Sequence, residues 1–175
     1  WNEITASSLA TVTLDGKVIS HDDVELAPAG LNFHSGILRE RPDVGAIIHC
    51  HAMPGVVISA TKQELMIVHQ SGIHMHGEVG YHDFEGFVQE GDEVPRLLAD
   101  LGEKHTLVMW NHGLLSIGSS VPDAFFYMRR LIELCEVQER LLATGAEIRH
   151  IPADVLEFTR KQLAEKRKKR PYSEV

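Results

Sequence analysis

A short apolar run at residues 44–52, VGAIIHCHA, constrains the fold of this chain most. A short apolar run of this kind predicts a β-strand, and this one carries His49 and His51 near its end. Residues two apart on a strand project from the same face, so the two imidazoles lie close enough to share one metal ion. Cys50 between them points to the opposite face, which we interpret as core. The apolar residues before the pair supply the rigid support that a metal site needs.

Two histidines do not complete a catalytic zinc site, which takes three protein ligands and keeps one position open. The natural third ligand is His112, because it follows a predicted strand at 105–110 and precedes Gly113, where a tight turn can aim its ring. If both strands lie in one sheet, the three imidazoles converge. Such a site suits a Lewis acid that polarises a carbonyl group. The alternative is a chance pairing, since the chain holds 11 histidines.

The rest of the chain indicates a mixture of helices and strands. The clearest helix covers 122–143, with Ser120 and Asp123 as a capping pair at its start and Gly145 after its end. The other expected elements are a hairpin over 9–20 that turns at Asp15-Gly16, a helix at 31–39, a strand at 65–69, a mostly irregular stretch at 71–86, a helix at 93–101, strands at 105–110 and 114–118, and a charged helix at 153–169.

Length, charge and composition limit the class of protein. With 175 residues, 43% of them hydrophobic, the chain can bury a real core, and we expect one domain at 1–150 and a charged helix and tail at 151–175. The net charge of -8 argues against nucleic-acid binding, and no apolar run is long enough to span a membrane. Two cysteines are too few for a disulfide framework, so we predict a cytoplasmic protein. The chain begins at Trp1, and we expect that the first part of a longer domain is missing.

Three motifs follow one another along the chain, namely Arg-Pro-Asp at 41–43, His-Cys-His at 49–51 and Asn-His-Gly at 111–113. In this order and spacing the chain resembles the class II aldolase/adducin family from Ile4 to about Ala146. The segments that carry the resemblance are HSGILRERPDVGAIIHCHAMPGVVISA at 34–60, GEVGYHDFEG at 77–86 and LVMWNHGLLSIGSSVPDAFFYMRRLIELCEVQ at 107–138.

The resemblance implies an α/β fold with three layers, α/β/α, around a mostly antiparallel central sheet. It implies that His49, His51 and His112 bind a divalent metal, most often Zn²⁺, with Mn²⁺, Co²⁺ or Fe²⁺ as alternatives. It also implies a small-molecule substrate and a homotetramer with active sites at the subunit interfaces. An additional N-terminal segment in the family supplies part of the sheet and part of the substrate site.

The chain departs from the sugar-phosphate aldolases of that family at two places. Those enzymes carry Ser-Ser-Glu just before a helix, where the serines hold phosphate and the glutamate is the acid/base, whereas the matching stretch 28–34 has Ala29 and Gly30 there. They also use a tyrosine shortly after the His-x-His motif, and here none occurs before Tyr81. Both departures argue against a phosphosugar substrate. They point to the adducin-like branch, in which adducin itself uses the domain as a cytoskeletal module.

Residues 69–82 are rich in titratable side chains and are a candidate pocket wall. Histidine suits proton transfer at neutral pH, and His69 ends a predicted apolar strand. Tyr81 precedes a turn that the sequence specifies well. We therefore take His69 and Tyr81 as the acid/base pair; the alternative is that most side chains of this stretch are solvated loop residues.

Three functions remain, each from a different class. The first, which we adopt, is a metal-dependent lyase that breaks a carbon–carbon bond, as an aldolase or decarboxylase does, in a small oxo- or hydroxy-compound. The metal held by three histidines would polarise the carbonyl and stabilise an enediolate. The second is a non-haem Fe(II) oxygenase on the same scaffold. The third is a non-catalytic, adducin-like assembly module.

Overall fold

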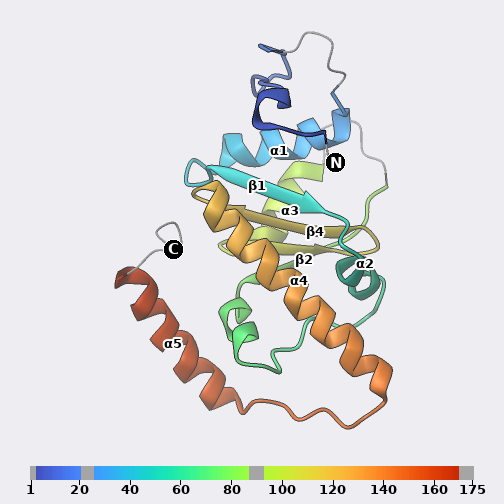
Figure 1. The fold of residues 1–175 in the computed structure, drawn as a ribbon, viewed down its shortest axis with the longest axis vertical. Coiled ribbons are helices and arrows are strands. Elements are labelled where there is room, and N and C mark those ends of the chain that lie inside the picture. The colour runs from blue at the N-terminus through green and yellow to red at the C-terminus, as the bar shows by residue number, and fades with distance from the viewer. Residues whose placement is uncertain (1–2, 21–25, 87–92, 170–175) are drawn as a thin grey trace.

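The computed structural model describes residues 3–20, 26–86 and 93–169. Within them, four strands form one sheet in the order β1-β4-β3-β2 (Figure 1). Strands β1 (Ala46–Cys50), β4 (Gly113–Gly118) and β3 (Thr106–Met109) pair antiparallel, and β2 (Val79–His82) runs parallel to β3. The mostly antiparallel sheet predicted from the family resemblance is therefore confirmed.

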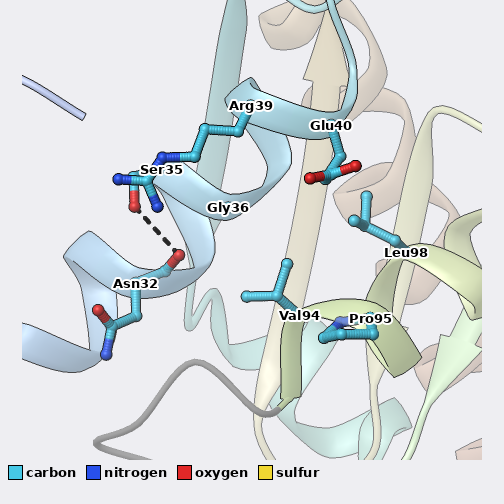
Figure 2. A pocket seen from close by; sticks show the side chains of 8 residues that line it. All are labelled: Asn32, Ser35, Gly36, Arg39, Glu40, Val94, Pro95 and Leu98. Carbon is cyan, nitrogen blue, oxygen red and sulfur yellow. Dashed lines mark hydrogen bonds between the residues drawn. The ribbon is translucent and has the colours of Figure 1, made fainter. Parts of the chain in front are cut away.

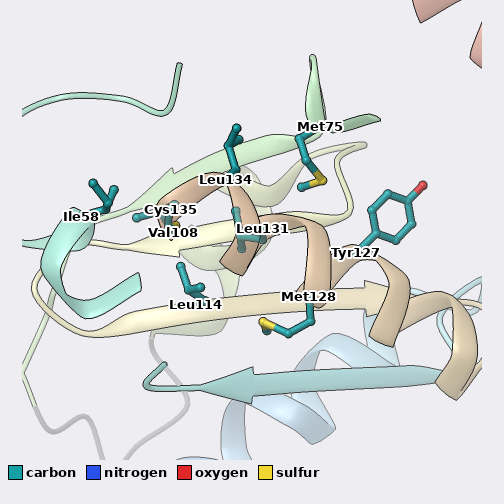
Figure 3. Close-up of a cluster of buried hydrophobic side chains, with 9 residues drawn as sticks. All are labelled: Ile58, Met75, Val108, Leu114, Tyr127, Met128, Leu131, Leu134 and Cys135. Carbon is teal, nitrogen blue, oxygen red and sulfur yellow. The ribbon is translucent and has the colours of Figure 1, made fainter. Parts of the chain in front are cut away.

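Helices cover both faces of this sheet, because successive strand residues point to opposite sides and both sides are apolar. On the α1/α3 face, α1 (Pro28–Glu40) and α3 (Val94–Leu101) pack over side chains such as Leu115. On the α4 face, α2 (Met53–Ser59) and α4 (Val121–Thr144) pack over side chains such as Leu114 (Figure 3). The three-layer α/β/α architecture is confirmed.

Helix α4 begins and ends where its sequence predicts. The Ser120 side chain accepts a hydrogen bond from the Asp123 backbone N–H at 3.4 Å, and Gly145 closes the helix in a left-handed conformation with φ of 63°. The Asp123 carboxylate accepts from the N–H of Ser119 at 3.1 Å, one residue earlier than in an ideal capping box. The helix then buries Tyr127 and its apolar neighbours against the sheet (Figure 3).

Helices α1 and α3 approach each other closely at Gly36 (Figure 2). A Cβ at Gly36 would lie 2.6 Å from a methyl group of Val94, so only glycine permits this contact. Arg41 of the Arg-Pro-Asp motif pairs with Asp43 through two hydrogen bonds of 2.8 Å and also donates to the Gly102 carbonyl. The motif therefore fixes the connection from α1 to β1 against the end of α3.

The apolar segment 65–69 is not a strand, and the prediction for it was wrong. Its backbone donors bond to side chains: the Leu65 N–H donates to Tyr81 Oη at 2.8 Å, and the Met66 N–H donates to Gln138 Oε1 at 2.7 Å. The stretch 71–86 is more regular than expected, because it contains a 3₁₀ helix, η2 (Ser71–Met75), and strand β2.

The remaining elements lie outside the sheet. The expected hairpin over 9–20 is reduced to one antiparallel bridge between Val12 and Val18, after a short 3₁₀ helix, η1 (Ala6–Ser8). Helix α5 (Ala153–Lys169) follows an extended connection and contacts η2 (Figure 1). No helix among the described residues is both long and apolar enough to cross a membrane. The division of the chain near residue 150 stays a prediction.

Candidate metal centre

The three predicted ligands come together at one end of the sheet. His49 lies in β1 and His51 directly after it, while His112 occupies the turn between β3 and β4. One ligand atom from each ring lies within 4.8 Å of the other two. The ring centroids are 4.8 to 4.9 Å apart. Antiparallel pairing of β1 with β4 causes this convergence, because it sets the end of β1 beside the turn before β4.

Hydrogen bonds orient the His49 ring as a metal ligand requires. Its Nδ1 lies 2.9 Å from the Leu114 carbonyl oxygen, which can only accept, so Nδ1 carries the proton and Nε2 keeps a lone pair. Nε2 of His49 lies 3.0 Å from Nε2 of His51, which donates to it. A metal ion would take the place of the His51 proton that this contact now shares. The backbone therefore fixes the nitrogen that faces the site.

Burial favours the neutral form of two of these imidazoles, those of His49 and His112. Desolvation, followed by the neighbouring His112, lowers the pKa of His49 from 6.5 to about 4. Desolvation, followed by His51, also lowers the pKa of His112. A neutral imidazole offers the lone pair that a divalent cation binds, whereas imidazolium does not. A donor set of three imidazole nitrogens fits a divalent transition metal.

The Asn-His-Gly turn has a shape that these residue types permit. Asn111 has a φ of 56°, a left-handed conformation that asparagine adopts more readily than most residues, and its N–H donates to the Ser59 carbonyl at 2.8 Å. At Gly113, a Cβ would lie 2.7 Å from the Cys50 carbonyl oxygen and 2.7 Å from Cδ2 of His51. The motif therefore brings the third ligand against the first two without a side chain in between.

The triad forms part of the wall of a cavity of about 1050 Å³ on the α1/α3 face. The wall is mainly apolar and aromatic, with His34 and Glu93 as further titratable groups. The lining residues are Leu9, Gly30, Phe33, His34, Ile47, Ile48, His49, His51, Phe84, Gly86, Glu93, Met109, Asn111 and His112. A concave, mostly apolar site with a few convergent polar groups is the usual form of a small-molecule site.

The structure does not bring the predicted acid/base pair to the triad within one chain. His69 packs beside Gly72 and α4, and its Nε2 is 3.8 Å from Glu133 Oε1. Among the described residues, neither of its ring nitrogens has a hydrogen-bond partner. The Tyr81 ring stacks on Trp110 on the α4 face, with centroids 5.0 Å apart, and burial raises its pKa to about 12. Neither residue lines the cavity of the triad.

Sequence reasoning missed Glu93, which lines the cavity from the start of α3. One of its carboxylate oxygens lies 3.2 Å from Nε2 of His82. Only the folding of β2 against α3 brings these two residues together, and no motif in the sequence marks Glu93. The periodicity of α3 predicts the helix but not that the residue before it lines the cavity.

Comparison with known proteins agrees with this geometry. The profile of the class II aldolase and adducin N-terminal domain matches residues 1–139. A Pseudomonas aeruginosa protein named for class 2 aldolases is 38% identical over 164 residues, which are 94% of this chain and 63% of that protein. Rat alpha-adducin is 38% identical over 148 residues, which are 83% of this chain and 20% of that protein. This chain thus spans less than two thirds of the length of either relative.

Solved structures of similar proteins share the fold. The crystal structure of an aldolase II superfamily protein from Pseudomonas syringae has a TM-score of 0.86 and 35% identity, covering 92% of this chain and 66% of that one. An L-fuculose 1-phosphate aldolase from Glaciozyma antarctica has a TM-score of 0.73 and 30% identity, covering 87% of this chain and 59% of that one. From the profile match, the relatives and these structures, we conclude that the chain belongs to the class II aldolase and adducin family.

Proposed function

We propose that this chain is a metal-dependent carbon–carbon lyase for a small oxo- or hydroxy-compound. The observation that carries the proposal is the convergence of His49, His51 and His112 on the wall of a cavity of about 1050 Å³. A divalent ion supplies a Lewis acid that polarises a carbonyl and stabilises the negative charge that develops on its oxygen. The proposed ion is zinc, because three nitrogens and one open position are the typical ligand set of catalytic zinc.

The cavity favours a substrate without a phosphate group. Phosphate recognition in proteins relies on arginine, lysine or a cluster of backbone N–H groups. No lysine or arginine is present among the described residues that line the cavity. Gly30 stands where the sugar-phosphate aldolases have their glutamate, and a Cβ there would meet nothing within 4 Å. The cavity therefore suits a small carbonyl compound or hydroxy acid.

Assembly and location belong to the same proposal. A homotetramer is supported by large apolar side chains that are exposed in the single chain, such as Val121, Phe125 and Phe158, at 68%, 59% and 63%. Within it, His69 and Tyr81 take part in acid/base chemistry only if they serve the site of a neighbouring subunit. The two free cysteines agree with the reducing cytoplasm, where we propose that the protein works.

A second function competes because rat alpha-adducin is as similar to this chain as the bacterial class 2 relative is. In that case the chain is a non-catalytic assembly module. A non-haem Fe(II) oxygenase uses a similar set of open positions, although its common ligand set is two histidines and a carboxylate.

Metal analysis of anaerobically purified protein by elemental mass spectrometry tests the three functions. Zinc, manganese or cobalt near one per subunit, followed by cleavage in a screen of oxo- and hydroxy-acids, supports the lyase. Iron near one per subunit with oxygen consumption would replace it by the oxygenase. If no metal is bound even after supplementation, the non-catalytic assembly module is the function that remains.

A further inference from the structure

Glu93 stands at the edge of the metal centre in a fixed position. It directly precedes α3, whose first residue, Val94, packs into the space that Gly36 leaves on α1 (Figure 2). This contact fixes the first turn of α3 against α1. Glu93 therefore lines the cavity from the residue just before a helix whose start is packed in place.

The His82 ring contacts the Glu93 carboxylate, and Asp100 contacts the other side of the same ring. The His82 side chain is only 2% exposed, and both of its ring nitrogens face carboxylates: Nε2 lies 3.2 Å from Glu93 and Nδ1 lies 2.8 Å from Asp100. A carboxylate only accepts hydrogen bonds, and a neutral imidazole donates only one. A ring with a proton on each nitrogen is the form that would donate to both carboxylates at once.

Glu93 is near the triad without belonging to it. The group that can hold a metal among the described residues consists of the three histidines alone. Desolvation lowers the pKa of His112 and the charge of Glu93 opposes that effect, so the carboxylate lies within electrostatic range of the third ligand. Glu93 therefore lines the same cavity as the triad without being a member of it. Such a group is suited to proton transfer.

We propose that Glu93 is the acid/base residue of this metal centre, and that His82 and Asp100 are its positioning residues. A bound ligand gives the proton of a C–H or O–H group to a Glu93 oxygen, and the electron pair of that bond stays on the ligand. In the reverse direction Glu93 returns the proton. The inference rests on the proposed metal centre, but it does not depend on which bond the enzyme breaks.

Calorimetry tests the proton transfer without an activity assay. The probe is acetohydroxamic acid, which loses its proton when it chelates zinc, titrated into zinc-loaded protein in two buffers of different ionisation enthalpy. If Glu93 takes that proton, wild type releases close to no proton to the buffer, whereas Glu93→Gln releases about one. We also expect Glu93→Gln to bind the probe roughly 10- to 100-fold more weakly, because a hydrogen bond to a charged group is lost.

A matched control is Glu85→Gln, which removes the same charge from a glutamate that pairs with Arg96 outside the cavity. This control should behave as wild type. Equal proton release and equal affinity in wild type and Glu93→Gln would overturn the assignment. Zinc-loaded wild type that does not bind the probe would overturn the open metal centre, and the role of Glu93 with it.

The positioning role has its own readout in the metal-free protein. Nitrogen-15 NMR of His82 should show both ring nitrogens protonated in wild type and one proton fewer in Asp100→Asn, with the zinc stoichiometry unchanged. A ring that stays doubly protonated in Asp100→Asn would refute the role of Asp100. If the proton count depends on Glu93 but no compound in the substrate screen is cleaved, the lyase is wrong and the role of Glu93 stands.

Discussion

Replacing Gly113 by alanine should damage the metal centre from the backbone side. The new Cβ would lie 2.7 Å from Cδ2 of His51 and 2.7 Å from the Cys50 carbonyl oxygen. Carbon atoms in contact settle at about 3.5–4.0 Å, so the ring or the strand has to withdraw by roughly 1 Å. Functional sites tolerate displacements of about 0.5 Å, and zinc affinity should therefore fall roughly 10- to 100-fold.

The same substitution should also cost stability, because the backbone of β1 yields less easily than a side chain. Overpacking of this kind costs about 1–3 kcal/mol, which lowers Tm by about 2–12 °C in a domain of this size. The assays are thermal unfolding of the metal-free protein by circular dichroism and zinc affinity by competition with a chelator.

The control for this prediction is Gly30→Ala, which adds the same methyl group to a wall of the same cavity. There a Cβ meets nothing within 4 Å and the residue lies within α1, so stability should rise by up to about 1 kcal/mol and zinc affinity should stay the same. If Gly113→Ala binds zinc as tightly as wild type, the explanation of the Asn-His-Gly motif by a close backbone approach is wrong.

Alanine at His49, His51 or His112 should reduce zinc binding below detection in elemental analysis, and a variant that keeps one zinc per subunit would exclude that residue as a ligand. In the metal-free protein, the unfolded chain binds a proton at His49 below pH 6.5 while the folded chain does so only near pH 4. The free energy of unfolding should therefore decrease as the pH is lowered from 6.5 to 4, by about 1–2 kcal/mol after solvent screening. This pH dependence should vanish in His49→Gln. Leu114→Ala removes a fully buried side chain between β4 and α2 and should cost about 2–5 kcal/mol in denaturant unfolding.

Local sequence signals predicted the elements whose stability is local. Helix α4 carries its own cap and its own glycine stop, and β1, β3 and β4 are apolar enough to be recognised as strands. The strand predicted at 65–69 failed because apolar composition does not show which partner a backbone N–H will find. Here the partners are the side chains of Tyr81 and Gln138, which lie distant in the sequence.

Strand β2 was not predicted, because its local sequence signal is weak although it pairs in the sheet. It lies at the edge of the sheet, and Gly80 in its middle lowers the strand propensity of the segment. The structure explains that glycine: a Cβ at Gly80 would lie 2.5 Å from the Asp100 carbonyl oxygen. The close approach of α3 therefore requires a residue that sequence patterns treat as typical of a loop.

The candidate site also has a part that the sequence predicts and a part that it does not. The convergence of His49, His51 and His112 was predictable, because strand geometry places His49 beside His51 and a turn residue marks His112. The acid/base hypothesis relied on the density of titratable residues in one segment, and density carries no information about which face of the sheet a side chain occupies. Glu93 could be assigned to the cavity only from the position of α3 in the folded chain.

The antiparallel pairing of β1 with β4 would also determine when the protein acquires the proposed metal ion. A growing chain exposes the His-Cys-His pair first, and the third histidine follows only after α2, η2, β2, α3 and β3. The three nitrogens then stay apart until the strand that ends at Gly118 has docked beside β1. A ribosome-bound chain that stops before His112 should hold no tightly bound ion, and capture of the ion therefore marks the end of folding rather than its start.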